Sequence, residues 1–304
     1  MGINRRRFLI GAGMAGMGMA GVSKLLSDQI WHSNSVSAIP LPKSKLLQRF
    51  AVVADTGTGG IKQYEIGRAL ARYHQKSPFD TVLLAGDNIY TNGEFTKIKS
   101  VFTLPYQELL GRGVKFYACL GNHDVRPVDR GASQVAYPDF NMQGKRYYSH
   151  GKGDVQFFTL ETNAIVNLND PDRVAQLEWL DQELAASKAK WKIVSGHHNI
   201  YSSGVYGVNE VMERAVTPIL KKYNVKLWIN GHDHNYQRSK PIDGTTYLVC
   251  GGGGASLYPV KPQSWTAFAQ SVHSFGIVEV YQNQILLTGI DSYSRVIDRG
   301  LVMA

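Results

Sequence analysis

The sequence has too little cysteine for a disulfide framework. Its 304 residues include only Cys119 and Cys250, and each stands at the end of an apolar, strand-like run. Cysteines in such positions usually pack as small hydrophobic side chains. A single bridge between them stays open in an oxidising compartment, because the sequence does not place the two sulfur atoms.

After residue 38 the sequence also lacks any basic run longer than a pair such as Lys221-Lys222. No basic-aromatic stripe or known nucleic-acid module accompanies these pairs. The whole chain carries a formal net charge of +9, of which about +6 belongs to residues 39–304. This spread-out positive charge is expected to attract anionic substrates, and nucleic-acid binding is not expected.

The first 38 residues have the pattern of an export signal. Three arginines lie in Asn4–Ile10, an apolar run rich in Gly, Met and Ala spans Gly11–Val22, and Val36-Ser37-Ala38 is a small-residue cleavage site. The pair Arg5-Arg6 resembles a twin-arginine signal, which directs folded proteins out of a bacterial cytoplasm. The alternative is a membrane anchor, but the run is shorter than the roughly 20 apolar residues of a span. We therefore expect cleavage, no stable span in the mature form, and a periplasmic or extracellular location.

Residues 39–304 are expected to form a single α+β catalytic domain with a central pair of sheets and outer helices. Apolar spacing and end signals predict helices over 62–75, 98–110, 172–189 and Val211–Tyr223. The late segments Thr246–Cys250, Phe275–Tyr281 and Gln284–Asp291 are predicted as strands of a closing antiparallel sheet.

Five polar motifs follow apolar, strand-like runs. The runs are Phe50–Ala54, Thr81–Ala85, Lys115–Leu120, Lys192–Ser195 and Lys226–Ile229, and the motifs are Ala54-Asp55, Gly86-Asp87-Asn88-Ile89-Tyr90, Gly121-Asn122-His123-Asp124, Gly196-His197-His198 and Gly231-His232-Asp233-His234. Carboxylates and imidazoles at the ends of buried strands are held rigidly and face a shared crevice. A lone aspartate there would usually be a turn or cap residue, but five motifs in series favour a metal site.

The residue types suit two neighbouring cations. Asp55 and Asp87 offer hard oxygen ligands, and Asp87 could bridge two ions with its two oxygens. Two metals roughly 3.5–4 Å apart form the clamp expected for in-line phosphoryl displacement. Imidazole ligands from His197, His232 and His234 suit iron, zinc or manganese better than calcium.

These motifs resemble the calcineurin-like metallophosphoesterase superfamily, and within it the small, single-domain purple acid phosphatases of the tartrate-resistant type. The deciding residue is Tyr90, because Asp55-Thr56-Gly57 lacks the first-motif histidine of most relatives. The likeness runs from about residue 50 to 290 and implies a four-layer sandwich of two mixed β-sheets flanked by helices. Val125 and His198 depart from the pattern of the best-known mammalian forms, which leaves substrate-side contacts open.

The resemblance also implies roles for individual residues. One metal would be iron(III) and the other divalent iron, zinc or manganese, and a metal-bound hydroxide would attack phosphorus. His123 would protonate the leaving group, while Asp124 would either orient His123 or form a turn. The first metal would be held by Asp55, Asp87, Tyr90 and His234, and the second by Asp87, Asn122, His197 and His232.

The function expected from these features is that of an exported phosphomonoesterase whose partners are a small phosphorylated substrate and the export machinery for folded proteins. One alternative is a phosphodiesterase of the same fold acting on nucleotides or lipid head groups, and another is a non-catalytic module that binds a phosphorylated ligand. Gly251–Gly254 is expected to be a backbone turn beside the site, and His150 and His273 to be surface or packing residues. The cationic candidates near the mouth are Arg126, Arg130 and His198.

Overall fold

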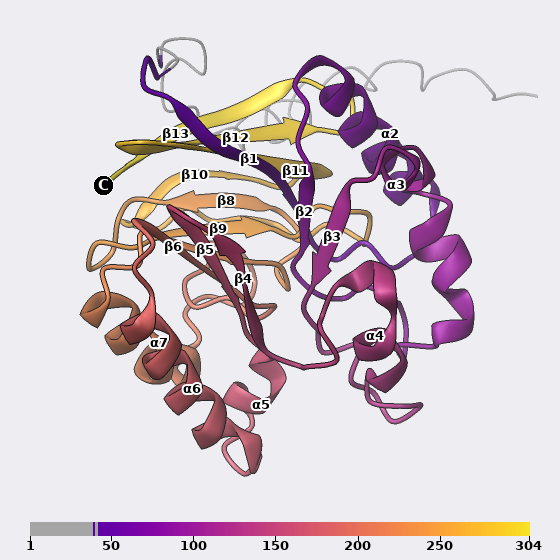
Figure 1. Ribbon diagram of the computed structural model, residues 1–304. Coiled ribbons are helices and arrows are strands. Elements are labelled where there is room, and N and C mark those ends of the chain that lie inside the picture. Colours follow the sequence, from indigo (N-terminus) through magenta and orange to yellow (C-terminus); the bar gives the residue numbers. More distant parts are fainter. Residues whose placement is uncertain (1–38, 40–41) are drawn as a thin grey trace, which may run out of the picture. The chain divides into compact units, whose positions relative to one another are not determined.

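The computed structural model describes residue 39 and residues 42–304, so the proposed export signal lies outside the described residues. The described part is built on two mixed β-sheets (Figure 1). The first sheet has the strand order β13-β12-β11-β1-β2-β3. Its strands are β1 (Leu46–Val53), β2 (Thr81–Leu84), β3 (Lys115–Ala118), β11 (Ser274–Tyr281), β12 (Gln284–Asp291) and β13 (Val296–Met303).

The second sheet has the order β10-β8-β9-β7-β6-β5-β4. Strands β5, β6, β7 and β9 are parallel neighbours, whereas β4, β8 and β10 pair antiparallel. Its strands are β4 (Tyr148–Lys152), β5 (Val155–Thr159), β6 (Trp191–Ser195), β7 (Leu227–Asn230), β8 (Tyr236–Ser239), β9 (Thr246–Cys250) and β10 (Thr266–Gln270).

Helices cover the outer faces of both sheets (Figure 1). Beside the first sheet lie α2 (Ile61–Lys76) and α3 (Gln107–Gly111), and along the second lie α5 (Thr162–Val166), α6 (Asp172–Ala186) and α7 (Glu210–Lys222). The shorter elements are η1 (Phe95–Lys97), η2 (Lys99–Thr103), α4 (Ala132–Ala136) and η3 (Pro138–Phe140). None of the described helices is long and apolar enough to cross a membrane.

Three apolar cores hold these layers together. One fills the space between the two sheets, where Phe50 of β1 meets Phe157 of β5 edge to face at 5.0 Å. The others lie under α2 and α3 and under α5–α7. The second half of β1, Phe50–Val53, and all of β2 and β7 are buried, because these central strands are covered on both faces. The sandwich with its mixed sheets confirms the fold class expected from the sequence.

Two predictions of secondary structure are wrong, and the end of a third element is misplaced. The helix expected over 98–110 is broken into η2 and α3, because Pro105 has no backbone N–H and disfavours a helical conformation in the residue before it. Thr246–Cys250 does not join the antiparallel β11 and β12. It pairs parallel with β7 in the other sheet, where it is buried throughout its length. The helix expected over 172–189 ends earlier, at Ala186.

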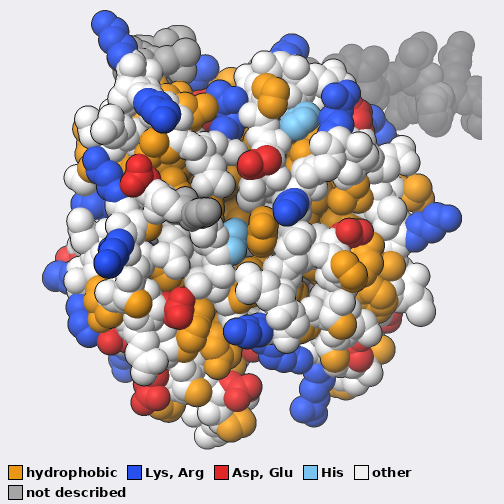
Figure 2. Space-filling model, in the orientation of Figure 1, with side chains coloured by type: hydrophobic (Ala, Val, Ile, Leu, Met, Phe, Trp, Pro, Cys, Tyr) orange, Lys and Arg blue, Asp and Glu red, His pale blue; other side chains and the backbone are white. Residues whose placement is uncertain are grey.

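Cys119 and Cys250 are both buried and free, as expected of small hydrophobic side chains. Lys and Arg side chains are scattered over the face seen in Figure 2 and do not gather into one patch there. That distribution agrees with the spread-out charge of the sequence.

His150 is a packing residue, as the sequence suggested. Its ring is stacked between Tyr117, at 3.8 Å, and Phe157, at 4.8 Å. Both ring nitrogens are buried and meet no hydrogen-bond partner within the described residues. Burial lowers the pKa of His150 to about 3. The imidazole is therefore neutral in the fold and protonates more easily in the unfolded chain.

We expect His150→Phe to make the metal-free protein more resistant to acid. A lowered native pKa means that the unfolded state binds more protons, so stability falls as pH drops below about 6.5. Phenylalanine keeps the stack and removes this proton linkage. The wild type should lose about 1–2 kcal/mol more than the variant between pH 6.5 and 4.5 in urea unfolding. Equal losses in the two proteins would show that His150 carries none of the acid sensitivity.

Candidate metal centre

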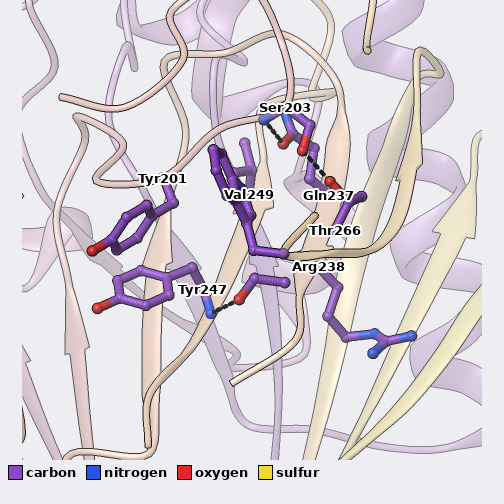
Figure 3. Close-up of a pocket in the computed structure, with 9 residues that line it drawn as sticks. Tyr201, Ser203, Gln237, Arg238, Tyr247, Val249 and Thr266 are labelled. Carbon is purple, nitrogen blue, oxygen red and sulfur yellow. Dashed lines mark hydrogen bonds between the residues drawn. The ribbon is translucent and has the colours of Figure 1, made fainter. Parts of the chain in front are cut away.

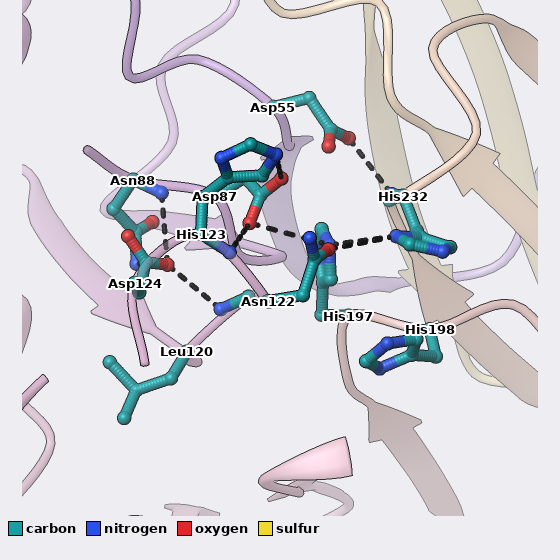
Figure 4. A network of polar contacts seen from close by, with 12 residues as sticks. Asp55, Asp87, Asn88, Leu120, Asn122, His123, Asp124, His197, His198 and His232 are labelled. Carbon is teal, nitrogen blue, oxygen red and sulfur yellow. Dashed lines mark hydrogen bonds and ion pairs between the residues drawn. The ribbon is translucent and has the colours of Figure 1, made fainter. Parts of the chain in front are cut away.

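The carboxyl ends of strands from both sheets bring the five motifs together. Asp55 follows β1, Asp87 follows β2, Asn122 follows β3, His197 follows β6, and His232 follows β7 (Figure 4). Asp55, Asp87 and His232 have φ angles of 58°, 54° and 68°. These left-handed conformations turn the chain sharply out of each strand and are uncommon outside glycine.

A glycine precedes several of these residues because the backbones approach closely there. A Cβ atom at Gly86 would lie 2.5 Å from Nδ1 of His197, and one at Gly231 would lie 2.5 Å from Oδ2 of Asp55. At Gly121 it would overlap the carboxylate of Asp87. The glycines of the motifs therefore make room for the polar side chains.

One half of the site contains Asp55, Tyr90 and His234. The Tyr90 hydroxyl lies 3.2 Å from Oδ1 of Asp55 and 3.1 Å from Nε2 of His234. Nδ1 of His234 contacts the carbonyl oxygen of Ser256 at 2.7 Å. A proton on Nδ1 leaves the Nε2 lone pair directed into the site, and metal-binding histidines are usually oriented by such a hydrogen bond from the other ring nitrogen.

The other half contains Asn122, His197 and His232. Oδ1 of Asn122 lies 3.0 Å from Nε2 of His197 and 3.0 Å from Nδ1 of His232, and these two nitrogens are 3.2 Å apart. Nδ1 of His197 faces the carbonyl oxygen of Ala85 at 2.9 Å, so its Nε2 is again the free lone pair. An amide oxygen and two imidazoles converging in this way form a donor set suited to a divalent transition metal.

Asp87 connects the two halves. Its Oδ1 lies 3.5 Å from Nε2 of His197. Single ligand atoms of Asp55, Asp87 and His234 also lie within 4.8 Å of one another. A carboxylate shared by two donor sets is what a two-metal site requires, so the residues present fit a pair of cations.

The electrostatics of the cluster favour positive charge. Burial raises the pKa of Tyr90 far above its usual value, and the carboxylates of Asp55 and Asp87 raise it further. Burial lowers the pKa of His197, but Asp87 and Asp55 outweigh it and the net shift is upward. The contribution of the carboxylates to both shifts reflects uncompensated negative charge. A cation would relieve it and would stabilise a Tyr90 phenolate.

His123 lies at the edge of the cluster. Its Nδ1 contacts the carbonyl oxygen of Thr91 at 2.7 Å, and its Nε2 is 4.0 Å from Oδ2 of Asp87. The side chain is 21% exposed, so Nε2 can be reached by a bound molecule. The ring of Tyr90 supports it at 4.5 Å.

Asp124 does not make the hydrogen bond to His123 that the sequence suggested. It is fully buried and accepts from the backbone N–H groups of Gly121, Asn88 and Ile89 (Figure 4). Burial and the charge of Asp87 raise its pKa to about 7. This geometry matches the turn-forming alternative, with Asp124 joining the loops after β2 and β3.

Of the three cationic candidates, His198 differs from expectation. His198 is buried, its Nδ1 contacts Oγ1 of Thr162 at 2.8 Å, and burial lowers its pKa to about 3, so it is neutral. Arg126 contacts Oδ1 of Asn92 at 3.3 Å. Arg130 lines a cavity of about 620 Å³ with Val125.

Two aromatic residues at the site are not part of any sequence motif. Tyr206 stacks on His232 with ring centroids 4.1 Å apart, and Tyr258 stacks on His234 at 4.2 Å. Tyr206 lies in the loop after β6, which carries His197, whereas Tyr258 lies in the loop after β9, where no candidate ligand marks the sequence.

Gly251–Gly254 forms a backbone turn beside the site, as expected. A Cβ atom at Gly251 would lie 2.9 Å from Oδ2 of Asp55. The N–H of Gly253 donates to the carbonyl oxygen of Ala54 at 3.1 Å.

Comparisons with known proteins identify the class. A family model described as calcineurin-like phosphoesterase matches residues 48–236. Purple acid phosphatase 7 of Arabidopsis thaliana is 30% identical over 245 residues, covering 71% of this chain and 73% of that protein. Human tartrate-resistant acid phosphatase type 5 is 26% identical over 290 residues, covering 80% of this chain and 87% of that protein.

Solved structures support the fold. The yellow lupin purple acid phosphatase PPD1 matches with a TM-score of 0.71 and 22% identity, covering 87% of this chain and 55% of that one. The Plasmodium protein GAP50, an anchor in the inner membrane complex, matches with a TM-score of 0.77 and 21% identity. The match covers 85% of this chain and 89% of that one. The chain belongs to the calcineurin-like phosphoesterase family. Its relatives include purple acid and tartrate-resistant acid phosphatases.

Proposed function

We propose that this protein is an exported, binuclear-metal phosphatase that hydrolyses phosphomonoesters in the manner of a purple acid phosphatase. The observation that carries the proposal is the shared position of Asp87. It lies between an oxygen-rich half with Tyr90 and an imidazole half with Asn122.

In this proposal Asp55, Asp87, Tyr90 and His234 hold iron(III), and Asp87, Asn122, His197 and His232 hold divalent iron, zinc or manganese. When bound, the two ions would lower the pKa of a water and neutralise charge on phosphoryl oxygens. His123 would stand beside the leaving-group oxygen and would protonate it as an imidazolium, because Nδ1–H is donated to the Thr91 carbonyl oxygen and only the doubly protonated ring also carries a proton on Nε2. The loops joined by Asp124 would hold this geometry.

We expect the iron-loaded protein to be purple to pink, and Tyr90→Phe to bleach it. A Tyr90 phenolate on iron(III) would give a broad charge-transfer band in the visible region. Phenylalanine keeps the ring that packs on His123 and removes only the oxygen. Visible spectra, iron content and circular dichroism should be recorded together. A folded variant with full iron content and an unchanged colour would rule out Tyr90 as a ligand.

The main alternative is a phosphodiesterase acting on nucleotides or lipid head groups, and a non-catalytic binding module is the second. Rates on a phosphomonoester and on bis(4-nitrophenyl) phosphate separate the first from the proposal. A metal-loaded protein that binds phosphate but turns over neither ester would support the binding module.

Export is part of the proposal and is supported by residues 1–38 of the sequence. Replacing Arg5-Arg6 by Lys-Lys should retain the precursor in the cytoplasm of a bacterial host, because the export machinery recognises the two arginines themselves and not only their positive charge. Cell fractionation provides the measurement. Export at the normal rate after the replacement would favour a general secretory signal or an anchor.

A further inference from the structure

Tyr258 is held rigidly beside the candidate metal centre. Its N–H donates to the carbonyl oxygen of His234 at 2.9 Å, and its ring lies nearly parallel to the His234 imidazole, at 4.2 Å and 11°. Two residues earlier, the carbonyl oxygen of Ser256 contacts Nδ1 of the same imidazole. Backbone and ring contacts with one histidine therefore fix the orientation of Tyr258.

Tyr206 extends the aromatic surface. Its ring centroid lies 6.0 Å from that of Tyr258, and it is stacked on His232. The loop that carries it is tied to β8 and β10 by Ser203, which bonds to Gln237 and Thr266 (Figure 3). Asp233 also accepts from Ser202 and from the N–H of Tyr206. An aromatic ring that is 45% exposed is thus presented on an anchored loop.

Tyr258 faces a cavity that also reaches His123. The cavity has a volume of about 680 Å³, and its lining includes Tyr90, His123, His234 and Tyr258. That volume is within the range of sites that bind small organic ligands. Because His123 is the group proposed to face the leaving-group oxygen, whatever is attached to that oxygen must occupy this cavity.

The charge of the cavity favours an uncharged occupant. Among the described residues that line it there is no carboxylate, and apart from histidine Lys97 is the one charged side chain. The Lys97 ammonium is already engaged by Glu94, at 3.1 Å, and by the carbonyl oxygen of Tyr90. An anionic leaving group would find no unpaired cation among these lining side chains, whereas a planar ring would find the aromatic side chain of Tyr258.

We propose that Tyr258 is a specificity-determining residue that stacks on the leaving group, and that the preferred substrates are phosphomonoesters of planar aromatic groups, either aryl or nucleoside. This inference deepens the proposed function and rests on it. Stacking of one ring on an aromatic side chain changes affinity by roughly 5- to 30-fold.

The test uses molecules that differ only in the ring. Benzyl phosphate and cyclohexylmethyl phosphate are both primary alkyl esters, and so are adenosine 5′-monophosphate and ribose 5-phosphate. The ratio of kcat/KM within each pair cancels any general loss of metal or activity. Binding of benzylphosphonate and cyclohexylmethylphosphonate to the metal-loaded protein supplies the same ratio without turnover. Tyr258→Ala, Tyr258→Phe and Tyr293→Ala should be compared with the wild type.

The wild type should prefer the aromatic member of at least one pair by roughly 5- to 30-fold. Tyr258→Ala should reduce the preference below about twofold, and Tyr258→Phe should keep it. Tyr293→Ala should keep it too, because this 69%-exposed ring contacts Arg295 after β12 and no site residue. The pair that shows the effect identifies the source, aryl or nucleoside.

No preference in any pair, or one that survives Tyr258→Ala, would overturn the inference. Aromatic preference in phosphonate binding without any ester hydrolysis would instead retain the stacking site and reject the phosphatase proposal.

Discussion

Asp87→Asn is expected to remove metal from both halves of the site and to lower turnover of phosphomonoesters by at least roughly 10³-fold. The Asp87 carboxylate faces both donor sets, and asparagine replaces one of its oxygens with a poor ligand. Asparagine also adopts the φ of 54° at this position more readily than most non-glycine residues do. Metal content by mass spectrometry and kcat should be measured on the same preparation.

Stability with and without metal distinguishes loss of a ligand from misfolding. Wild-type protein should gain about 2.7 kcal/mol when free metal is 100-fold above its Kd, and the variant should gain much less. Without metal the variant should be at least as stable, because Asp87→Asn removes a negative charge beside Asp55 and Asp124. Asp291→Asn is the matched control, since this buried carboxylate accepts from Arg295 at the end of β12 and touches no candidate ligand. Full metal content in Asp87→Asn would contradict the shared position.

The clustering of the candidate ligands could be predicted from the sequence, because each candidate lies within a few residues of the end of a strand. Once Asp55 and Asp87 follow neighbouring parallel strands, the sheet itself brings them together. Glycine before the polar residue gave a second local signal, since close backbone approach requires it. Local signals of this kind do not depend on how distant parts of the chain pack.

The features that the sequence did not predict depend on distant packing. Tyr258 reaches His234 only because the chain after β9 returns past β7, and no motif marks that return. Thr246–Cys250 is an apolar run that is buried throughout its length. Such a run predicts a buried strand but does not say which of the two sheets the strand joins. Asp124 was equally plausible as an orienting residue or a turn former until its backbone partners were known.

The role proposed for His123 is the one most open to a kinetic test. Its imidazole is anchored through Nδ1 to Thr91 and lies outside the donor triangle of Asn122, His197 and His232. Its substitution should therefore leave the metals bound. His74 is a suitable control, because it lies in the last turn of α2, before the start of β2, whereas the candidate ligand Asp87 follows the other end of that strand.

His123→Ala is expected to keep both metals and the colour but to lower kcat for alkyl phosphates by roughly 10²–10⁴-fold, the usual contribution of a general acid. The loss should shrink for 4-nitrophenyl phosphate, because that leaving group departs without a proton. His74→Ala should leave both rates unchanged. Steady-state rates on the two esters, with metal content and the visible spectrum, provide the measurement. If His123→Ala loses a metal, His123 acts as a ligand. An equal fall on both esters with the metals retained would mean that His123 positions the phosphate and does not protonate the leaving group.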